Sequence, residues 1–271
     1  MEEQIEHSLT KRFKSDIWRK FVKGINEYEM IKENDKIAVC ISGGKDSMLL
    51  ALCFKHLHKY SKFKFDVEYI VMNPGYREEN VELIKQNADK IGIDIHMFNS
   101  PIFDVVAEVG GSPCYLCARM RRGYLYEFAK SLGCNKIALG HHFDDVVETI
   151  LLSMFYGSEY KTMMPKLKST NHVGMELIRP LYLVKEQDII NWRNYNNLNF
   201  LQCACKMTEA TAENNLELTS KRKEIKDLLK TLKEKNPNVD MNIFRSIHRV
   251  NLSTVIGYKL GDKEVNFLDE Y

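Results

Sequence analysis

The segment Ile37-Ala-Val-Cys-Ile-Ser-Gly-Gly-Lys-Asp-Ser47 decides the fold, because an apolar strand runs directly into a glycine-rich turn. Met48-Leu-Leu-Ala-Leu-Cys53 then starts a helix with an apolar face. Glycines let backbone N–H groups approach a phosphate closely, and the following helix offers its positive end. Residues 42–47 are therefore predicted to bind the phosphates of a nucleotide. An ordinary strand–turn–helix corner without a ligand is the alternative.

The polar residues of this loop support the nucleotide interpretation. Gly43 and Gly44 permit positive φ, and Lys45 adds a mobile cation. The common P-loop needs four residues between its first glycine and the Gly-Lys pair, so the adjacent glycines exclude that motif here. The residues predicted to contact the nucleotide in this loop are Ser42, Gly43, Gly44, Lys45, Asp46 and Ser47.

Composition narrows the class of protein. Hydrophobic residues make up 44% and charged residues 28% of the 271 residues, which is typical of a globular chain. No apolar run approaches the roughly 18 residues that span a bilayer, and the first residues lack a secretory core. We therefore expect a cytoplasmic protein without a membrane partner. The net charge of +2 gives no evidence for nucleic-acid binding, so any such binding would depend on local basic patches.

The pattern over residues 36–157 alternates short apolar strands with helices, as in a parallel sheet covered by helices on both faces. An amphipathic helix over 5–30 precedes it, and its basic face either meets RNA phosphates or is merely solvated. The predicted strands are 36–42, 65–73, 94–99, 136–141 and about 176–182. The predicted helices are 45–59, 77–91, 118–132, 144–157, 185–197, 212–235 and 240–249, followed by a tail.

Polar residues follow three of the predicted strands. Ser42, Asn73 and Gly140-His141-His142 come directly after strand ends. Ligands of parallel sheets bind at the carboxyl ends of the strands, so these residues should line one cleft, with Asn73, Gly140 and His141 in contact with the nucleotide. Asp144 or Asp145 lies where a carboxylate either caps the next helix or holds Mg²⁺.

The seven cysteines fall into two groups. Cys40, Cys53 and Cys134 lie in apolar surroundings and are predicted to be small buried residues. Cys114-Tyr-Leu-Cys117 and Cys203-Ala-Cys205 have the close spacing of metal ligands. A metal centre or iron–sulfur cluster is the favoured interpretation, and zinc, a redox-active dithiol and a plain structural role remain alternatives.

Three arginines follow the first cysteine pair. Arg119, Arg121 and Arg122 fall within one and a half turns of a predicted helix. Clustered guanidinium groups favour an anion, and their planar fork suits phosphate. We expect them to bind the RNA backbone or ATP, and a solvated helix face is the alternative.

Several motifs, taken in order, resemble the tRNA 2-thiocytidine synthetase (TtcA) family and its tRNA-thiolating relatives over about residues 20–205. The glycine-rich loop over residues 42–47 resembles the PP-loop of the ATP pyrophosphatases, to which this family belongs. The resemblance implies an α/β fold of the adenine nucleotide α-hydrolase-like, Rossmann-like kind, with a parallel sheet, helices on both faces, and added N- and C-terminal helices. The matching motifs are Ser42–Ser47, Cys114-x-x-Cys117-x-Arg-x-Arg-Arg-Gly, Lys136-Ile-Ala-Leu-Gly-His-His-x-Asp-Asp145, Met154-Phe-Tyr-Gly157, Pro165-Lys-Leu167 and Ile178-Arg-Pro-Leu181.

The resemblance also implies an activity. Such an enzyme uses ATP and Mg²⁺ to adenylate a carbonyl of a tRNA base, and then replaces the oxygen with sulfur from inorganic sulfide or a cysteine desulfurase. Lys45, Asp46, Cys114 and Cys117 would be catalytic. A [4Fe-4S] cluster would be held by Cys114, Cys117 and a third cysteine. Cys205 is the preferred third ligand and Cys203 the alternative, because the family's Pro-Cys-x-x-Cys segment is here Gln202-Cys203-Ala-Cys205, without the proline and one residue shorter.

The resemblance divides the chain into an N-terminal basic helix over 1–34, a PP-loop catalytic domain over 35–205 and a C-terminal helical extension over 206–271. Cytidine is the expected base, because no cysteine cluster precedes Cys40, and uridine is the variant. Two other functions remain alternatives, namely delivery of an amine to the activated base and an ATP-binding module that senses metal or redox state. A homodimer is compatible with this kind of fold.

Overall fold

The computed structural model describes residues 2–102, 113–201 and 216–269, with side chains described for 2–102, 120–201 and 221–269. These residues form two compact units. One comprises Met1–Val146 and Met164–Lys221, and the other comprises Val147–Met163 and Arg222–Tyr271. In none of the described helices does an apolar stretch reach the length needed to cross a membrane. The three regions predicted from the sequence stay a prediction.

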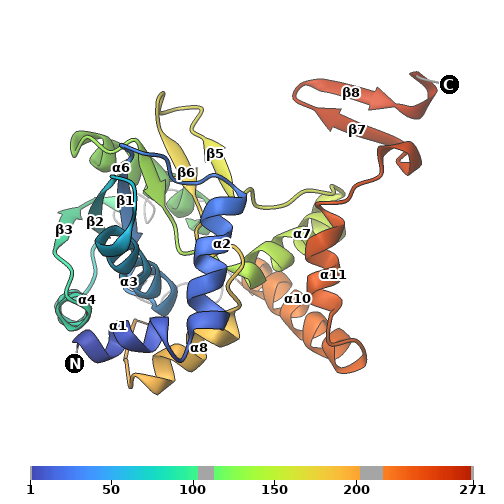
Figure 1. The fold of residues 1–271 in the computed structure, drawn as a ribbon. Coiled ribbons are helices and arrows are strands. Elements are labelled where there is room, and N and C mark those ends of the chain that lie inside the picture. Colours follow the sequence, from blue (N-terminus) through green and yellow to red (C-terminus); the bar gives the residue numbers. More distant parts are fainter. Residues whose placement is uncertain (1, 103–112, 202–215, 270–271) are drawn as a thin grey trace. The chain divides into compact units, whose positions relative to one another are not determined.

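The first unit contains a six-stranded sheet with the order β3-β2-β1-β4-β6-β5 (Figure 1). Every neighbouring pair is parallel except β5 and β6, which are antiparallel. The predicted α/β fold with a mainly parallel sheet is therefore confirmed, and β5 is a strand that the sequence analysis missed. The strands are β1 (Lys36–Ile41), β2 (Asp66–Asn73), β3 (Ile95–Asn99), β4 (Lys136–Ala138), β5 (Lys166–Lys168) and β6 (Glu176–Ile178).

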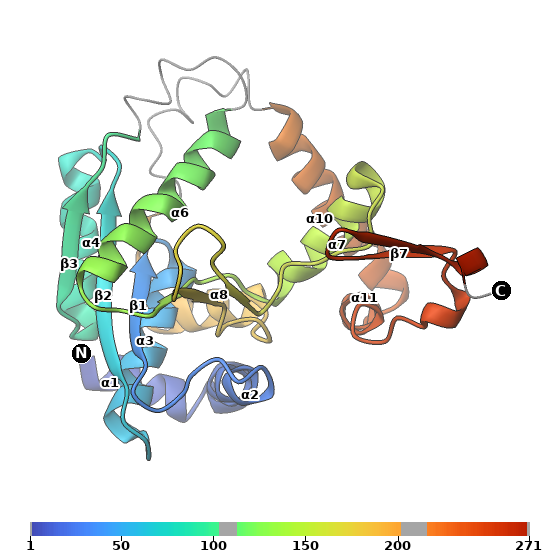
Figure 2. The ribbon, with the colours of Figure 1, turned by 90° about the horizontal axis from the view of Figure 1, so that it is seen from above.

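Helices cover both faces of this sheet (Figure 1, Figure 2). On one face, Tyr126 and Ala129 of α6 (Pro113–Ser131) pack against Ala38 and Cys40 of β1. Side chains alternate along a strand, so the buried Val39 faces the other layer. That layer contains α3 (Lys45–Tyr60), α4 (Glu78–Ile91) and α8 (Glu186–Tyr195). The central strands are thus buried on both faces, which explains their continuous apolar sequence.

The predicted N-terminal helix is broken into three pieces. They are α1 (Glu2–Thr10), a π-helical turn (Lys14–Trp18) and α2 (Arg19–Glu27). The apolar stripe recurs every four residues, which exceeds the about 3.6 residues of an α-helical turn, so a straight helix would carry the stripe away from the core. The wide turn, in which Trp18 N–H donates to the Phe13 carbonyl (3.3 Å), keeps Phe13 and Ile17 buried.

The second unit combines most of α7 (Phe143–Gly157) with α10 (Leu216–Lys235), α11 (Val239–Ser246) and the two-stranded β7 (Gly257–Leu260) and β8 (Lys263–Asn266). Glu148 of α7 is buried and pairs with Arg222 (3.4 Å) and Lys226 (3.6 Å) of α10. The hairpin was missed in the sequence analysis, which expected only a tail. Two short 3₁₀ turns complete this part of the chain, at Leu252–Thr254 and Phe267–Asp269.

Candidate functional site

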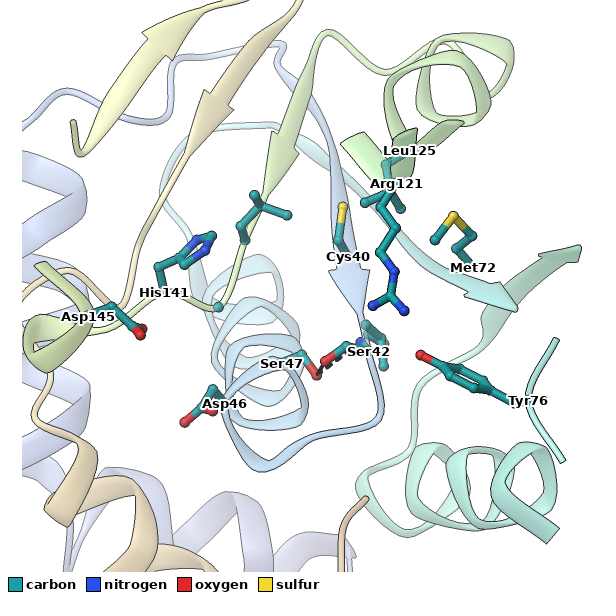
Figure 3. Close-up of a pocket in the computed structure, with 13 residues that line it drawn as sticks. Cys40, Ser42, Asp46, Ser47, Met72, Tyr76, Arg121, Leu125, His141 and Asp145 are labelled. Atoms are coloured by element: carbon teal, nitrogen blue, oxygen red, sulfur yellow. Dashed lines mark hydrogen bonds between the residues drawn. The ribbon is translucent and has the colours of Figure 1, made fainter. Parts of the chain in front are cut away.

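A cavity of about 300 Å³ lies at the carboxyl ends of β1, β2 and β4, where the sequence predicts a ligand (Figure 3). It collects side chains from the glycine-rich loop, from the loop after β4 and from α6. The predicted residues that line it are Ser42, Asp46, Ser47, Gly140, His141, Asp145 and Arg121. Gly43, Gly44 and Lys45 belong to the same loop and shape it from outside the lining.

The glycine-rich loop is held in a shape that requires glycine at position 43. Gly43 has φ +85°, and a Cβ there would lie 2.7 Å from Cδ1 of Leu201 and 2.8 Å from Cγ1 of Ile84. Ser47 Oγ ties the loop together, because it accepts a bond from Ser42 N–H (3.1 Å) and donates to the Gly44 carbonyl (3.0 Å). Gly44 is the N-cap of α3 and offers no side chain to the first N–H groups of that helix. Such uncapped groups are suited to a phosphate.

The loop after β4 touches the glycine-rich loop backbone to backbone. A Cβ on Gly140 would lie 3.1 Å from the carbonyl carbon of Asp46 and 3.1 Å from the Ser47 nitrogen. The contact arises because β4 is the parallel neighbour of β1 in the sheet. Only glycine fits this approach without displacing either loop, and the approach places His141 on the cavity wall.

Asp46 has an unsatisfied carboxylate oxygen at the cavity. Its Oδ1 is buried and has no hydrogen-bond partner in the described structure, with Nε2 of His142 3.9 Å away. Burial raises the pKa of Asp46, against the opposing effect of His142 and Lys45. A buried acceptor without a partner is costly, and a bound cation or ligand donor would satisfy it. Asp46 therefore fits a Mg²⁺ ion on a nucleotide phosphate.

Lys45 is held by two carboxylates. Its Nζ lies 3.1 Å from Oδ2 of Asp46 and 3.0 Å from Oε1 of Glu186, the first residue of α8. Burial alone would lower the pKa of Lys45, but the two carboxylates outweigh it and the pKa is raised. The cation is therefore retained at neutral pH. Sequence reasoning missed Glu186, because only the packing of α8 against α3 brings it here.

The two aspartates after β4 both cap helices. Asp145 Oδ2 accepts a bond from His142 N–H (3.0 Å), and Nδ1 of His142 accepts one from Asp145 N–H (3.4 Å). This reciprocal pair closes the start of α7 in the manner of a capping box. Asp144 Oδ2 accepts a bond from Glu186 N–H (2.6 Å) and so caps α8. Asp145 also lines the cavity.

Asn73 stabilises the turn after β2 next to the cavity. Its Oδ1 accepts bonds from the N–H groups of Gly75 (3.0 Å) and Tyr76 (2.7 Å), and its Nδ2 donates to Asn99 (3.1 Å). This turn places Tyr76 on the cavity wall. Direct contact of Asn73 with a nucleotide stays a prediction.

The wall opposite His141 was largely missed by sequence reasoning. It consists of Met72, Tyr76, Arg121 and Leu125, together with Cys40 in the strand below (Figure 3). Arg121 was predicted to bind the RNA backbone or ATP, and it lies in this cavity. Neighbouring side chains of β1, β2 and α6 meet here through tertiary packing, which carries no local sequence signal.

The cysteines divide as the sequence predicts, as far as the description reaches. Cys40, Cys53 and Cys134 are buried free thiols, and burial raises the pKa of each. Positions 114, 117 and 119 belong to α6, but their side chains lie outside the described residues, and Cys203 and Cys205 lie outside them entirely. Leu201 N–H, two residues before Cys203, donates to the Gly43 carbonyl (3.1 Å).

The fold and cavity define a nucleotide-binding α/β protein with a PP-loop, and the PP-loop domain family matches residues 10–216. A tRNA-cytidine(32) 2-sulfurtransferase from Citrifermentans bemidjiense is 34% identical, covering 84% of this chain and 88% of the relative. One from Geotalea uraniireducens is also 34% identical, covering 91% and 94%. The chain therefore belongs to the PP-loop family and, within it, to that of the tRNA-cytidine(32) 2-sulfurtransferases. The resemblance seen in the sequence is thereby confirmed.

A solved structure supports the fold independently. The U34-tRNA thiolase NcsA from Methanococcus maripaludis, determined with its [4Fe-4S] cluster, superposes with a TM-score of 0.67 at 22% sequence identity. The match covers 85% of this chain and 77% of NcsA. At this identity the likeness establishes the shared fold.

Proposed function

We propose that this chain is an ATP-dependent, iron–sulfur-dependent tRNA sulfurtransferase that forms 2-thiocytidine at position 32. The observation that carries the proposal is the cavity in which the PP-loop, the unsatisfied Asp46 oxygen and the Gly140-His141 loop meet. Relatives with this activity in their name match 84% and 91% of the chain. The expected compartment is the cytoplasm.

ATP fits the PP-loop side of the cavity. The uncapped N–H groups at the start of α3 would hold the phosphates, and Lys45 would add a positive charge next to them. Asp46 Oδ1 would ligate Mg²⁺, which would neutralise charge on the phosphates. These groups come from one rigid strand–helix junction, which keeps the α-phosphate in place for attack.

The proposed reaction has two steps. The carbonyl oxygen of the base attacks the α-phosphorus, the bond between that phosphorus and the bridging oxygen breaks, and pyrophosphate leaves. A sulfur nucleophile then adds to the base carbon, and AMP departs with the original carbonyl oxygen. Lys45 and Asp46 act in the first step by holding the triphosphate and its Mg²⁺. A base of the single-stranded anticodon loop can enter such a cavity without breaking a duplex.

The cysteines would bind the cluster close to this cavity. Positions 114, 117 and 121 are three and four residues apart in α6, so they share one face of the helix, and Arg121 of that face lines the cavity. The bond from Leu201 to Gly43 starts the segment of Cys203 and Cys205 at the PP-loop. Cys205 remains the preferred third ligand. A [4Fe-4S] cluster held by three cysteines would supply the sulfur chemistry of the second step.

Thiolation of a tRNA transcript tests the proposal. Protein purified anaerobically should show cluster absorbance and should form 2-thiocytidine and AMP from tRNA, ATP and sulfide, measured by nucleoside mass spectrometry. Cys117→Ala should lose both the absorbance and the product. Cys134→Ala should keep both, because Cys134 is a buried thiol in the hydrophobic core between α6 and the sheet. Thiolation by protein that holds only zinc would contradict the iron–sulfur part. Modification of uridine instead of cytidine would contradict the assigned base.

A further inference from the structure

A second cavity, of about 510 Å³, lies beside α6 in the same unit. Arg122 and Tyr126 of α6 form one part of its lining, and Ser169 and His172 of the β5–β6 loop form another. Arg179, directly after β6, completes it. Arg121 and Arg122 are consecutive in α6, yet Arg121 lines the first cavity and Arg122 the second.

Arg179 is a buried cation with an unused donor. It is 6% exposed, and its Nη1 donates to the Met164 carbonyl, while its Nε is buried and has no hydrogen-bond partner in the described structure. Burial lowers the pKa of Arg179 to about 10, which still leaves it charged at neutral pH. Asp145 favours the charged form of Arg179, but burial outweighs this effect, and a bound anion would offset the remaining cost.

The rest of the lining also suits an anion. Arg122 adds a second guanidinium, and its positive charge repels that of Arg179. No aspartate or glutamate is part of the described lining. Ser169, Thr170 and Asn171 contribute hydroxyl and amide groups. Two like charges with neutral donors around them form a complementary environment for phosphate.

The cavity also has a fixed aromatic wall. The rings of Tyr126 and His172 stack with centroids 4.8 Å apart and planes 18° apart. His172 N–H donates to Ser169 Oγ (3.1 Å), which fixes the loop that carries both residues. The groups around the anion position are therefore ordered before a ligand binds, which reduces the entropy lost on binding.

We infer that this second cavity binds a backbone phosphate of the RNA substrate. The inference rests on the proposed function, because it assigns the phosphate to the RNA whose base enters the first cavity. Arg122 is exposed at the cavity edge, so a polymer can reach it. The adjacency of Arg121 and Arg122 then sets a fixed separation between the bound phosphate and the nucleotide cavity, which would fix the register of the RNA.

Replacing Arg122 tests the inference without disturbing the core. The Kd of an anticodon stem-loop RNA is measured by fluorescence anisotropy over a series of KCl concentrations. Arg122→Gln should weaken binding about tenfold, and its plot of log Kd against log salt should be shallower by about 0.7 to 1, as expected for one lost phosphate contact. Lys130→Gln removes the same charge from an exposed site of α6 outside the cavity and should behave like wild type. ATP affinity should be unchanged in both variants.

Tungstate, a phosphate mimic, tests the anion position itself. Crystals of the full chain soaked in tungstate should show an anomalous peak bonded to Arg122 and Arg179. An Arg122→Gln variant with wild-type RNA affinity and salt dependence would overturn the inference, and a tungstate peak in that case would assign the cavity to a free anion. If RNA binding depends on Arg122 but no thionucleoside forms, the proposed function fails and the phosphate site stands.

Discussion

Two neighbouring junctions of the sheet share one sequence pattern and differ in one structural detail. β1 leads through Gly43 and Gly44 into α3, and β4 leads through Gly140 into α7. Both follow parallel strands that lie side by side. The start of α3 is capped only by a glycine, whereas the start of α7 is closed by the reciprocal bonds of His142 and Asp145.

This difference supports our proposal that phosphate binds at the first loop. A helix end whose N–H groups are already bonded to side chains has little to offer an anion, whereas an uncapped one retains its donors and its positive charge. We therefore assign the phosphates to the first loop and a supporting role to the second, which presses Gly140 against Asp46 and Ser47. Two loops of similar sequence thus have different proposed roles: the first binds phosphate and the second forms part of the cavity wall.

The largest effect should come from Asp46→Asn. Loss of the carboxylate that we assign to Mg²⁺ should lower kcat for thiolation by about 100-fold or more, which corresponds to about 2.7 kcal/mol of the barrier. Burial raises the pKa of Asp46 in the folded state, so its ionisation lowers stability as the pH rises through that pKa. At pH 7 the variant should therefore melt at the same temperature as wild type or higher. An inactive variant with a strongly lowered Tm would instead indicate a structural role.

Gly140→Ala should break the contact between the two loops. Its new Cβ would lie 3.1 Å from the backbone of Asp46 and of Ser47, so one loop must move. We expect the Kd for ATP, measured by calorimetry, to rise about tenfold, equivalent to about 1.4 kcal/mol. Gly157→Ala is the matched control, because nothing lies within 4 Å of a Cβ at that position. Equal ATP affinity in both variants would refute the close approach.

The sequence predicted the parts of this comparison that are local. The pattern around residues 42–47 predicts a phosphate-binding loop, because the strand, the glycines and the helix are contiguous in the chain. The adjacency of Gly140 to Asp46 also follows from the rule that strand ends of a parallel sheet meet at one edge. The burial of Cys40, Cys53 and Cys134 followed from their apolar neighbours.

Residues that depend on tertiary packing were missed. Tyr76 of the loop after β2 and Glu186 of α8 reach the two loops from distant parts of the chain, and no spacing in the sequence links them. The β7–β8 hairpin escaped notice because each of its strands is only four residues long and largely exposed, although Gly261 with φ +63° marks its turn. The break after α1 was missed because a four-residue repeat was taken for a continuous helix.

Two substitutions at Asp145 separate its cap from its charge. Asp145→Ala removes the bond to His142 N–H and should lower the free energy of unfolding by about 0.5 to 2 kcal/mol, measured by urea denaturation. Asp145→Asn keeps an acceptor oxygen, so most of that stability and most of the activity should remain. A stable Asp145→Asn variant with a large loss of kcat would instead assign a Mg²⁺ ligand to the second loop.

The smallest effect concerns the pair that holds Lys45. Glu186→Gln removes a carboxylate 3.0 Å from Nζ, which should lower the pKa of Lys45 relative to wild type, because carboxylates help to keep that pKa raised. At pH 9 a larger neutral fraction should then react with acetic anhydride. Labelling of Lys45, followed by peptide mass spectrometry, should rise about threefold, as expected for a partly exposed ion pair of about 0.6 kcal/mol.

Asp188→Asn provides the control for this measurement. Asp188 lies in the same turn of α8, but its carboxylate pairs with Lys20 (2.9 Å) and not with Lys45. Its loss should increase the labelling of Lys20 and leave that of Lys45 unchanged. If both variants leave Lys45 labelling at the wild-type level, Glu186 does not hold the cation, and Asp46 alone retains it at the PP-loop. If ATP suppresses Lys45 labelling in every variant, the result supports a contact between this lysine and the phosphates.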